Sequence, residues 1–137
     1  AQSLDELKMA CPDLALWIEP GRYLVAEAGV LLATVTQLKN KGERVYVGLD
    51  VGMNTLIRPA LYGSWHQIDS LSRLEEHNEI IADLVGPICE SGDVLGRGRS
   101  LPDCQSGDVM IIQTAGAYGR SMSSRYNLRE PAPERFV

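Results

Sequence analysis

The feature that most constrains the fold is a change of sequence pattern near residue 28. Before it, Ser3–Cys11 has the capping box and the apolar spacing of a short helix. Leu14–Ile18 is an almost wholly apolar run, which is typical of a strand buried on both faces in a parallel sheet. Because one helix and one such strand cannot form a sheet by themselves, the pattern predicts that they are the last unit of a larger α/β domain.

The rest of the sequence favours a mostly β domain. Arg22–Glu27 suits a helical turn. Strands are then expected at Gly29–Leu38, Arg44–Leu49, Glu79–Val85 and Asp108–Thr114. Many short strands need their edges covered, so the β part is predicted to close as a barrel or a sandwich.

Glycine and proline set the expected turns. Lys39–Glu43, which contains Gly42, is predicted to be the turn of a hairpin. Met53–Tyr62 is expected to be irregular or a short helix that Pro59 ends. Further turns are predicted at Gly92, Gly96, Gly98 and Gly107.

The charge balance and the cysteines restrict the possible partners. The net charge of −5 and a pI of about 5.0 do not favour binding to nucleic acid or to an anionic membrane. The odd number and wide spacing of Cys11, Cys89 and Cys104 argue against a disulfide framework and favour a reducing, cytoplasmic compartment. Cys11 and Cys104 are interpreted as incidental, with Cys104 exposed. His66 and His77 are too few for a metal site.

Four segments concentrate ionisable and polar side chains. They are Glu19–Arg22, the stretch from Asp50 to His66, Gly86–Asp93 and Ala115–Gly119. Each alone would pass as an ordinary turn. Together and in this order they resemble the fold-type III pyridoxal-phosphate decarboxylases, and most closely the branch that acts on diaminopimelate. The resemblance covers about residues 14–137.

The resemblance implies a division of the chain into two parts. Members of the family have an N-terminal (β/α)8 barrel, which carries the cofactor, and a C-terminal β domain. Residues 1–27 would then be a remnant of the barrel, its last helix and strand, and residues 28–137 the C-terminal β domain. Arg22–Leu32 and Leu71–Leu74 look most like the version fused to an aspartate kinase.

The resemblance also implies roles toward pyridoxal phosphate. Glu19 would keep the proton on the ring nitrogen of the cofactor, because a nearby carboxylate favours the protonated ring. Arg22 would bind an anionic group of the substrate or the cofactor. Tyr118 would hydrogen-bond the cofactor phosphate, and Gly116 and Gly119 would permit its close approach.

Substrate recognition would depend on Arg58, Tyr62 and Glu90. Meso-diaminopimelate has a second amino-acid centre far from the reacting carbon. Arg58 and Tyr62 would bind its carboxylate and Glu90 its ammonium, which favours diaminopimelate over ornithine. Ornithine, arginine and carboxynorspermidine decarboxylases are the alternatives within the family, and a non-catalytic dimerisation or regulatory domain is the alternative outside it.

The same resemblance gives Cys89 the role of protonating the reacting carbon after carbon dioxide leaves. Its loop would reach the active site of the neighbouring subunit, so a two-fold homodimer with shared sites is expected. Asp93 is interpreted as structural and His66 as a supporting residue.

The lysines do not match the family's Schiff-base lysine. They are Lys8, on the predicted helix, and Lys39 and Lys41, in the predicted turn. The chain by itself is therefore expected to be inactive and to bind no pyridoxal phosphate covalently.

Overall fold

The computed structural model describes residues 2–137 and is mostly strand. The α-helices are α1 (Gln2–Ala10), α2 (Gly21–Val25) and α3 (Arg58–Tyr62). The strands are β1 (Leu31–Lys41), β2 (Arg44–Leu49), β3 (Ile68–Ser70), β4 (Ile80–Val85), β5 (Val94–Leu101) and β6 (Val109–Ile112). Short 3-10 turns lie at Ala26–Ala28, Leu71–Arg73, Arg120–Met122 and Tyr126–Leu128.

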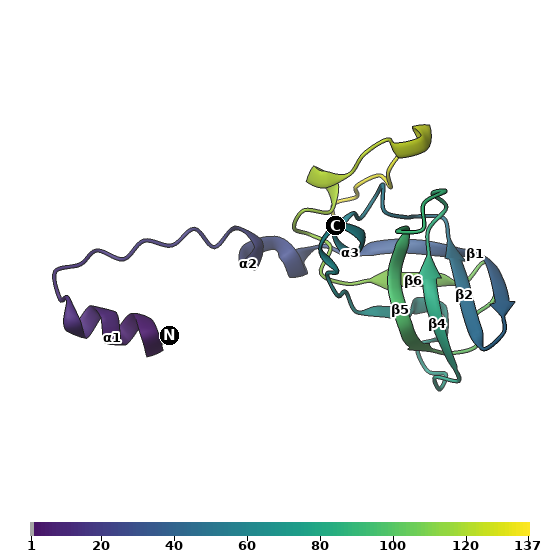
Figure 1. The fold of residues 1–137 in the computed structure, drawn as a ribbon, viewed down its shortest axis with the longest axis horizontal. Helices are drawn as coiled ribbons and strands as arrows, with labels where there is room; N and C mark the ends of the chain where they lie inside the picture. The colour runs from purple at the N-terminus through teal and green to yellow at the C-terminus, as the bar shows by residue number, and fades with distance from the viewer. Residues whose placement is uncertain (1) are drawn as a thin grey trace.

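All six strands form one curved sheet in the order β3-β6-β1-β2-β4-β5 (Figure 1). Most neighbours are antiparallel, and β2 and β4 run parallel. The two edge strands, β3 and β5, contact each other, so the sheet is nearly closed. This barrel-like closure covers the edges that would otherwise be open to pairing with another chain. The predicted fold, a mostly β barrel or sandwich domain, is confirmed.

The inner face of the sheet holds the core. In β1, Leu31, Ala33 and Val35 are buried whereas Leu32 is exposed, which is the two-residue alternation of a strand with one buried face. The largest fully buried side chains are Leu49, Leu56, Leu84, Leu95, Leu101, Met110, Ile112, Val35 and Val47. Each such burial contributes about 1.5–3 kcal/mol before conformational entropy is subtracted, so the closed sheet is the stable body of the molecule.

The predicted hairpin is confirmed, but its turn is tighter than expected. Lys39 pairs with Tyr46 and Lys41 with Arg44, so both lysines belong to the strand ladder. Only Gly42 and Glu43 form the turn, and Gly42 has a φ of +61°. Two-residue hairpin turns need such positive φ values because their twist must match that of the strands.

The turns predicted at Gly96 and Gly98 are wrong, because both glycines lie inside β5. A Cβ on Gly96 would lie 2.8 Å from Arg99 Nε and 2.9 Å from Ile68 Cδ1, so side chains of β5 and β3 pack closely against this glycine. Gly98 has a φ of +58° and its N–H donates to Asp83 Oδ1 (2.8 Å), near irregular pairing between β4 and β5. Glycines of this kind mark a bulge or a close contact within a strand.

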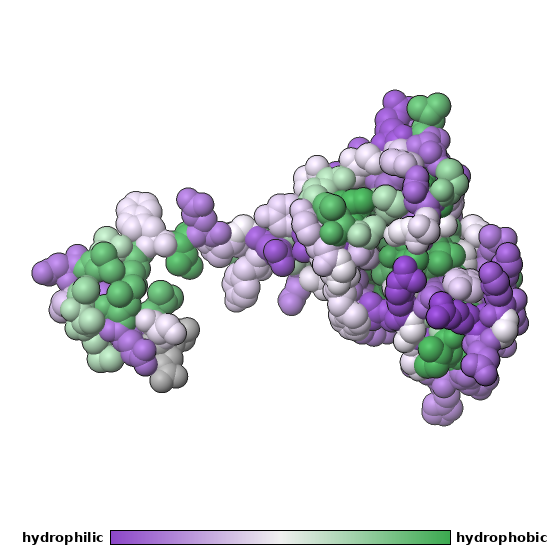
Figure 2. Space-filling view, viewed as in Figure 1, coloured by the Kyte–Doolittle hydropathy of each residue, from purple (hydrophilic) through white to green (hydrophobic). Residues whose placement is uncertain are grey.

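The buried strand predicted at Leu14–Ile18 is not formed. The helix before it is present as α1, but residues 14–18 are extended and exposed, with Trp17 at 91% and Ile18 at 74% exposure. The physical reason is that no described strand of the chain pairs with this segment. Figures 1 and 2 show α1 and this segment projecting away from the sheet, with apolar side chains gathered on α1.

Two smaller predictions are also wrong. Pro59 lies in the first turn of α3 and does not end it, since proline at that position removes no helical hydrogen bond. Gly63, which has a φ of +62°, caps the helix instead. Cys104 was predicted to be exposed but is buried, at 3% exposure, because its loop folds onto the core. Its Sγ donates a hydrogen bond to the Pro102 carbonyl oxygen (3.2 Å).

An ion pair between Arg73 and Asp108 joins the turn after β3 to the start of β6. Arg73 Nε lies 2.6 Å from Asp108 Oδ2, and both side chains are largely buried. Asp108 Oδ2 also accepts the Gln105 N–H (2.7 Å). Burial alone would raise the pKa of Asp108, but these hydrogen bonds more than offset it and lower the pKa below its ordinary value.

Asp108→Asn is expected to lower the free energy of unfolding by about 1–2 kcal/mol at pH 7. A lowered folded-state pKa stabilises the fold above the unfolded pKa of about 4, and this stabilisation is lost as pH falls through the folded value. Urea unfolding at pH 7 and at pH 3 should therefore show a clear difference between native and variant at pH 7 and a much smaller one at pH 3. Equal differences at both pH values would contradict the assignment.

Candidate active site

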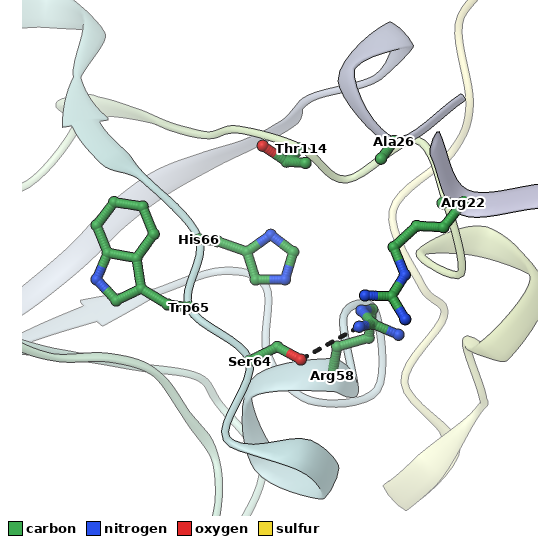
Figure 3. A pocket seen from close by; sticks show the side chains of 8 residues that line it. Arg22, Ala26, Arg58, Ser64, Trp65, His66 and Thr114 are labelled. Atoms are coloured by element: carbon green, nitrogen blue, oxygen red, sulfur yellow. Dashed lines mark hydrogen bonds between the residues drawn. The ribbon is translucent and has the colours of Figure 1, made fainter. Parts of the chain in front are cut away.

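A hollow of about 230 Å³ lies beside the sheet where α2, α3 and the chain after β6 meet. Figure 3 shows the guanidinium groups of Arg22 and Arg58 close together on one side of it and the His66 ring on the other. The hollow is lined by Arg22, Ala26, Arg58, Ser64, Trp65, His66, Thr114 and Ala117. Two guanidinium groups with no carboxylate among the lining residues favour an anionic ligand.

Gly116 holds the arginine-bearing helix α2 against the hollow. The Gly116 N–H donates to Ala26 O (3.0 Å), and the Ala115 N–H donates to Gly29 O (2.8 Å). A Cβ on Gly116 would lie only 2.0 Å from Val25 O, so no other residue fits without moving the backbone. Gly116 was expected to permit close approach of the cofactor, and in the structure it permits close approach of α2.

The Arg58 guanidinium lies close to two tyrosine rings. Its guanidinium carbon is 5.4 Å from the centre of the Tyr62 ring and 5.5 Å from that of Tyr118, and its Nη2 donates to Ser64 Oγ (3.3 Å). Cation–π contacts of this kind orient a guanidinium while leaving other N–H groups available. Tyr118 has a φ of +61°, as does Thr114 at the edge of the hollow. Non-glycine residues rarely adopt this conformation, and it is concentrated at ligand sites.

His66 contributes one free nitrogen to the buried side of the hollow. The ring is 4% exposed, and its Nδ1 lies 2.9 Å from the Gln113 carbonyl oxygen. Because a carbonyl only accepts hydrogen bonds, Nδ1 must carry the proton. Nε2 is buried and has no hydrogen-bond partner among the described residues. A buried polar atom of this kind is ordinarily satisfied by a ligand or an ordered water.

Cys89 and Glu90 form a second group on the loop between β4 and β5. Glu90 Oε1 accepts a hydrogen bond from the Tyr126 hydroxyl (2.6 Å), and Cys89 Sγ accepts one from Asn127 Nδ2 (3.0 Å). Both Cys89 and Glu90 are exposed. Within residues 2–137, no hydrogen bond or ion pair joins this loop to the Arg58 group.

Asp93 fixes the loop that carries Cys89 and Glu90. Its two carboxylate oxygens accept the backbone N–H groups of Met53 and Ile88, both at 2.6 Å, and the side chain is buried at 3% exposure. Burial raises the pKa of Asp93 above its ordinary value, although the two hydrogen bonds act in the opposite direction. These contacts agree with the structural interpretation of Asp93.

The structure brings together four of the seven predicted site residues: Arg22, Arg58, Tyr62 and Tyr118. Glu19 lies in the exposed segment before α2, and its side chain makes no hydrogen bond or ion pair with the rest of the described chain. The buried strand that was expected to hold it is not formed. Sequence reasoning missed the contacts of Tyr126 and Asn127, because their partners precede them by 36 and 38 residues.

Two general properties can be stated for residues 2–137. They contain no helix that is both long and apolar enough to cross a membrane. They also bring together no group of three or more His, Cys, Asp or Glu side chains that could bind a metal ion.

Residues 22–116 match a family model described as "Pyridoxal-dependent decarboxylase, C-terminal sheet domain". Diaminopimelate decarboxylase of Archaeoglobus fulgidus is 46% identical over 125 residues, which are 91% of this chain and 30% of that protein. The one from Methanothermobacter thermautotrophicus is 47% identical over 135 residues, 98% of this chain and 31% of that protein.

The solved structures agree with the sequence comparisons. Diaminopimelate decarboxylase from Helicobacter pylori complexed with L-lysine has a TM-score of 0.78 and 38% identity over 92% of this chain and 31% of that one. The chain thus spans about a third or less of the length of the relatives it matches.

Proposed function

The chain belongs to the pyridoxal-dependent decarboxylases, of which it is the C-terminal sheet domain, and from this premise we propose that it is the C-terminal part of a diaminopimelate decarboxylase. Such an enzyme converts meso-diaminopimelate to L-lysine and carbon dioxide. The observation that carries the proposal is that Arg58 contacts the rings of Tyr62 and Tyr118 and lines the same hollow as Arg22. This arrangement offers oriented donors to a carboxylate, which a diaminopimelate enzyme needs far from the reacting carbon.

The residues around the hollow suit pyridoxal phosphate as well as a carboxylate. The Arg22 guanidinium could bind a phosphate, and the unpaired His66 Nε2, an acceptor when Nδ1 carries the proton, could accept a hydrogen bond from a phosphate that keeps one proton. When bound, the cofactor supplies a ring that withdraws the electrons left by a departing carboxylate. Tyr118 would donate its hydroxyl to the phosphate, and Glu19 would hold a proton on the ring nitrogen once its segment is packed in the complete enzyme.

Substrate selection would depend on charges at the distal end of the substrate. Arg58 and Tyr62 would bind the distal carboxylate, and Glu90 would bind the distal ammonium. A substrate that lacks the carboxylate leaves Arg58 without its partner. Sites built to bind a polar group reject analogues without it by large factors, so ornithine and arginine should be poor substrates.

Cys89 would supply a proton. After carbon dioxide leaves, the α-carbon needs a proton, and a thiol held nearby can deliver it from Sγ. Because no hydrogen bond or ion pair among residues 2–137 joins the Cys89 loop to the Arg58 group, we infer that the loop serves the active site of a neighbouring subunit. This arrangement requires a two-fold homodimer whose active sites are shared.

Residues 1–27 would belong to an N-terminal (β/α)8 barrel domain. The exposed side chains of Leu16, Trp17 and Ile18 support this, since such an apolar segment is ordinarily covered in a folded protein. The free thiols of Cys11, Cys89 and Cys104 are compatible with a reducing cytoplasm.

The test is carbon dioxide release by the full-length polypeptide with added pyridoxal phosphate. Meso-diaminopimelate, ornithine and arginine are supplied separately. We expect carbon dioxide release from diaminopimelate to be at least about a hundredfold faster than from ornithine or arginine, because these two lack the distal carboxylate that Arg58 would bind. Faster release from ornithine or arginine would contradict the substrate assignment, and release from none would contradict the enzyme assignment.

A further inference from the structure

The C-terminal segment 123–132 folds back onto the segment that supports the Cys89 loop. The Ser124 N–H donates to Asn54 O (2.8 Å), and Asn54 Nδ2 donates to Arg129 O (3.3 Å). The Ala132 N–H donates to Thr55 Oγ1 (3.3 Å). Asn54 is only 3% exposed, so it is an interior anchor for a tail that is itself mostly exposed.

The same anchor holds the Cys89 loop. Asp93 accepts the Met53 N–H with one oxygen and the Ile88 N–H with the other. Met53 is the immediate neighbour of Asn54, and Ile88 is the immediate neighbour of Cys89. The tail and the loop are therefore both fixed to residues 53–55, which sets the distance between them.

From this anchor the tail presents two side chains to the loop. The Tyr126 hydroxyl donates to Glu90 Oε1 (2.6 Å), and the Asn127 amide donates to Cys89 Sγ (3.0 Å). Asn127 and Leu128 have φ values of +55° and +60°, a conformation that non-glycine residues adopt rarely. Backbone of this kind persists where surrounding contacts hold it, and it is concentrated at functional sites.

We propose that Tyr126 and Asn127 are positioning residues for the reaction, with Tyr126 orienting the Glu90 carboxylate and Asn127 holding the Cys89 thiol. The inference rests on the proposed function, in which Glu90 binds the distal ammonium and Cys89 delivers a proton. A glutamate on an exposed loop would otherwise sample several rotamers and lose that freedom on binding substrate. One hydrogen bond from Tyr126 leaves the second oxygen of Glu90 available for the ammonium.

The electrostatics agree with this arrangement. The hydrogen bond to Glu90, followed by the negative charge of Glu90, raises the pKa of Tyr126 above its ordinary value. The phenol therefore keeps its proton, and remains a donor to Glu90, throughout the neutral range.

The test is a pair of double-mutant cycles in the full-length polypeptide with diaminopimelate as substrate. Tyr126→Phe removes one hydroxyl and is combined with Glu90→Ala, which removes the acceptor of its hydrogen bond. Asn127→Gly removes the amide and tolerates the positive φ, and it is combined with Cys89→Ala. Tyr46→Phe, on the sheet strand β2, is the matched control for the loss of a tyrosine hydroxyl.

Tyr126→Phe is expected to raise KM about threefold to tenfold with kcat within twofold, the effect of losing one exposed hydrogen bond to a charged group. Asn127→Gly is expected to lower kcat by a similar factor with KM within twofold. Each effect should vanish in the background of its partner variant, since coupled residues are non-additive. Thermal unfolding midpoints of the single variants should match that of Tyr46→Phe.

Additive effects, or equal changes of kcat and KM together with a lowered unfolding midpoint, would show a purely structural tail and overturn this inference alone. The proposed function would then survive, because the unmodified polypeptide remains active. An unmodified polypeptide that releases no carbon dioxide from diaminopimelate would overturn the proposed function and this inference with it.

Discussion

Arg58→Met in the full-length polypeptide is expected to lower kcat/KM for diaminopimelate by about a hundredfold to a thousandfold. Methionine keeps an unbranched apolar stem and removes the guanidinium with its charge. The distal carboxylate of the substrate would then enter the site without its cation, and desolvating an unpaired carboxylate is costly. The rings of Tyr62 and Tyr118, which now flank the guanidinium at 5.4 and 5.5 Å, would lose the cation–π contacts that fix the site.

Steady-state carbon dioxide release measures this effect, and Arg97→Met is the matched control. Arg97 lies on β5 with its side chain 65% exposed and only a long contact of 3.9 Å to Asp83. Loss of an exposed arginine of this kind should change kcat/KM by less than about twofold. A change below about threefold for Arg58→Met would contradict the placement of Arg58 in the substrate site.

Gly86→Ala is expected to be the most destabilising single methyl addition in the loop that carries Cys89. A Cβ at this position would lie 2.3 Å from Asp93 Oδ2 and 2.4 Å from Gly52 Cα. Neither neighbour can move freely, because one is backbone and the other is a carboxylate held by two N–H groups. Overpacking of this severity costs about 3 kcal/mol or more in the free energy of unfolding.

Gly92→Ala in the same loop is the control. A Cβ on Gly92 would meet nothing within 4 Å, so its effect should be about 0.5 kcal/mol or less. Denaturant unfolding of the two variants side by side measures the difference. Equal stabilities would show that Asp93 and its glycine neighbours do not clamp the loop.

The sheet could be predicted from the sequence where side chains alternate. The residues of β2 were predicted with their observed bounds, and the hairpin was expected from the polar turn that contains Gly42. The prediction of turns was wrong where a glycine lies inside a strand because of its tertiary contacts. Gly96 looks like a turn residue, yet it lies inside β5 with the Arg99 and Ile68 side chains packed closely against it.

The run Leu14–Ile18 shows a different kind of failure. Its composition is that of a buried strand, but burial requires partners that the described chain does not place beside it. An apolar run indicates that a segment is stable only when it is buried. Whether it is buried depends on the neighbouring elements that cover it. The prediction for Cys104 was wrong in the opposite sense. Its polar sequence neighbours indicated an exposed loop, but its side chain packs into the core.

At the site, contacts between residues close in sequence could be predicted, whereas contacts between residues far apart in sequence could not. Arg58 and Tyr62 are one helical turn apart, so their proximity follows from local spacing. The approach of Tyr118 to Arg58 depends on how the chain after β6 packs against α2, which no local pattern contains. The structure shows where the seven predicted site residues lie, and the roles of all seven remain predictions.

We propose that one chain supplies its Arg58 group to one active site and its Cys89 loop to another. Arg58→Met and Cys89→Ala subunits of the full-length polypeptide can be co-expressed with two different tags, and the mixed dimers purified through both tags in turn. If sites are shared, one of the two sites in each mixed dimer is intact, so about half of the native carbon dioxide release should return. Mixed dimers as inactive as the two parent variants would show that both groups serve the same site within a chain, and the account would be wrong.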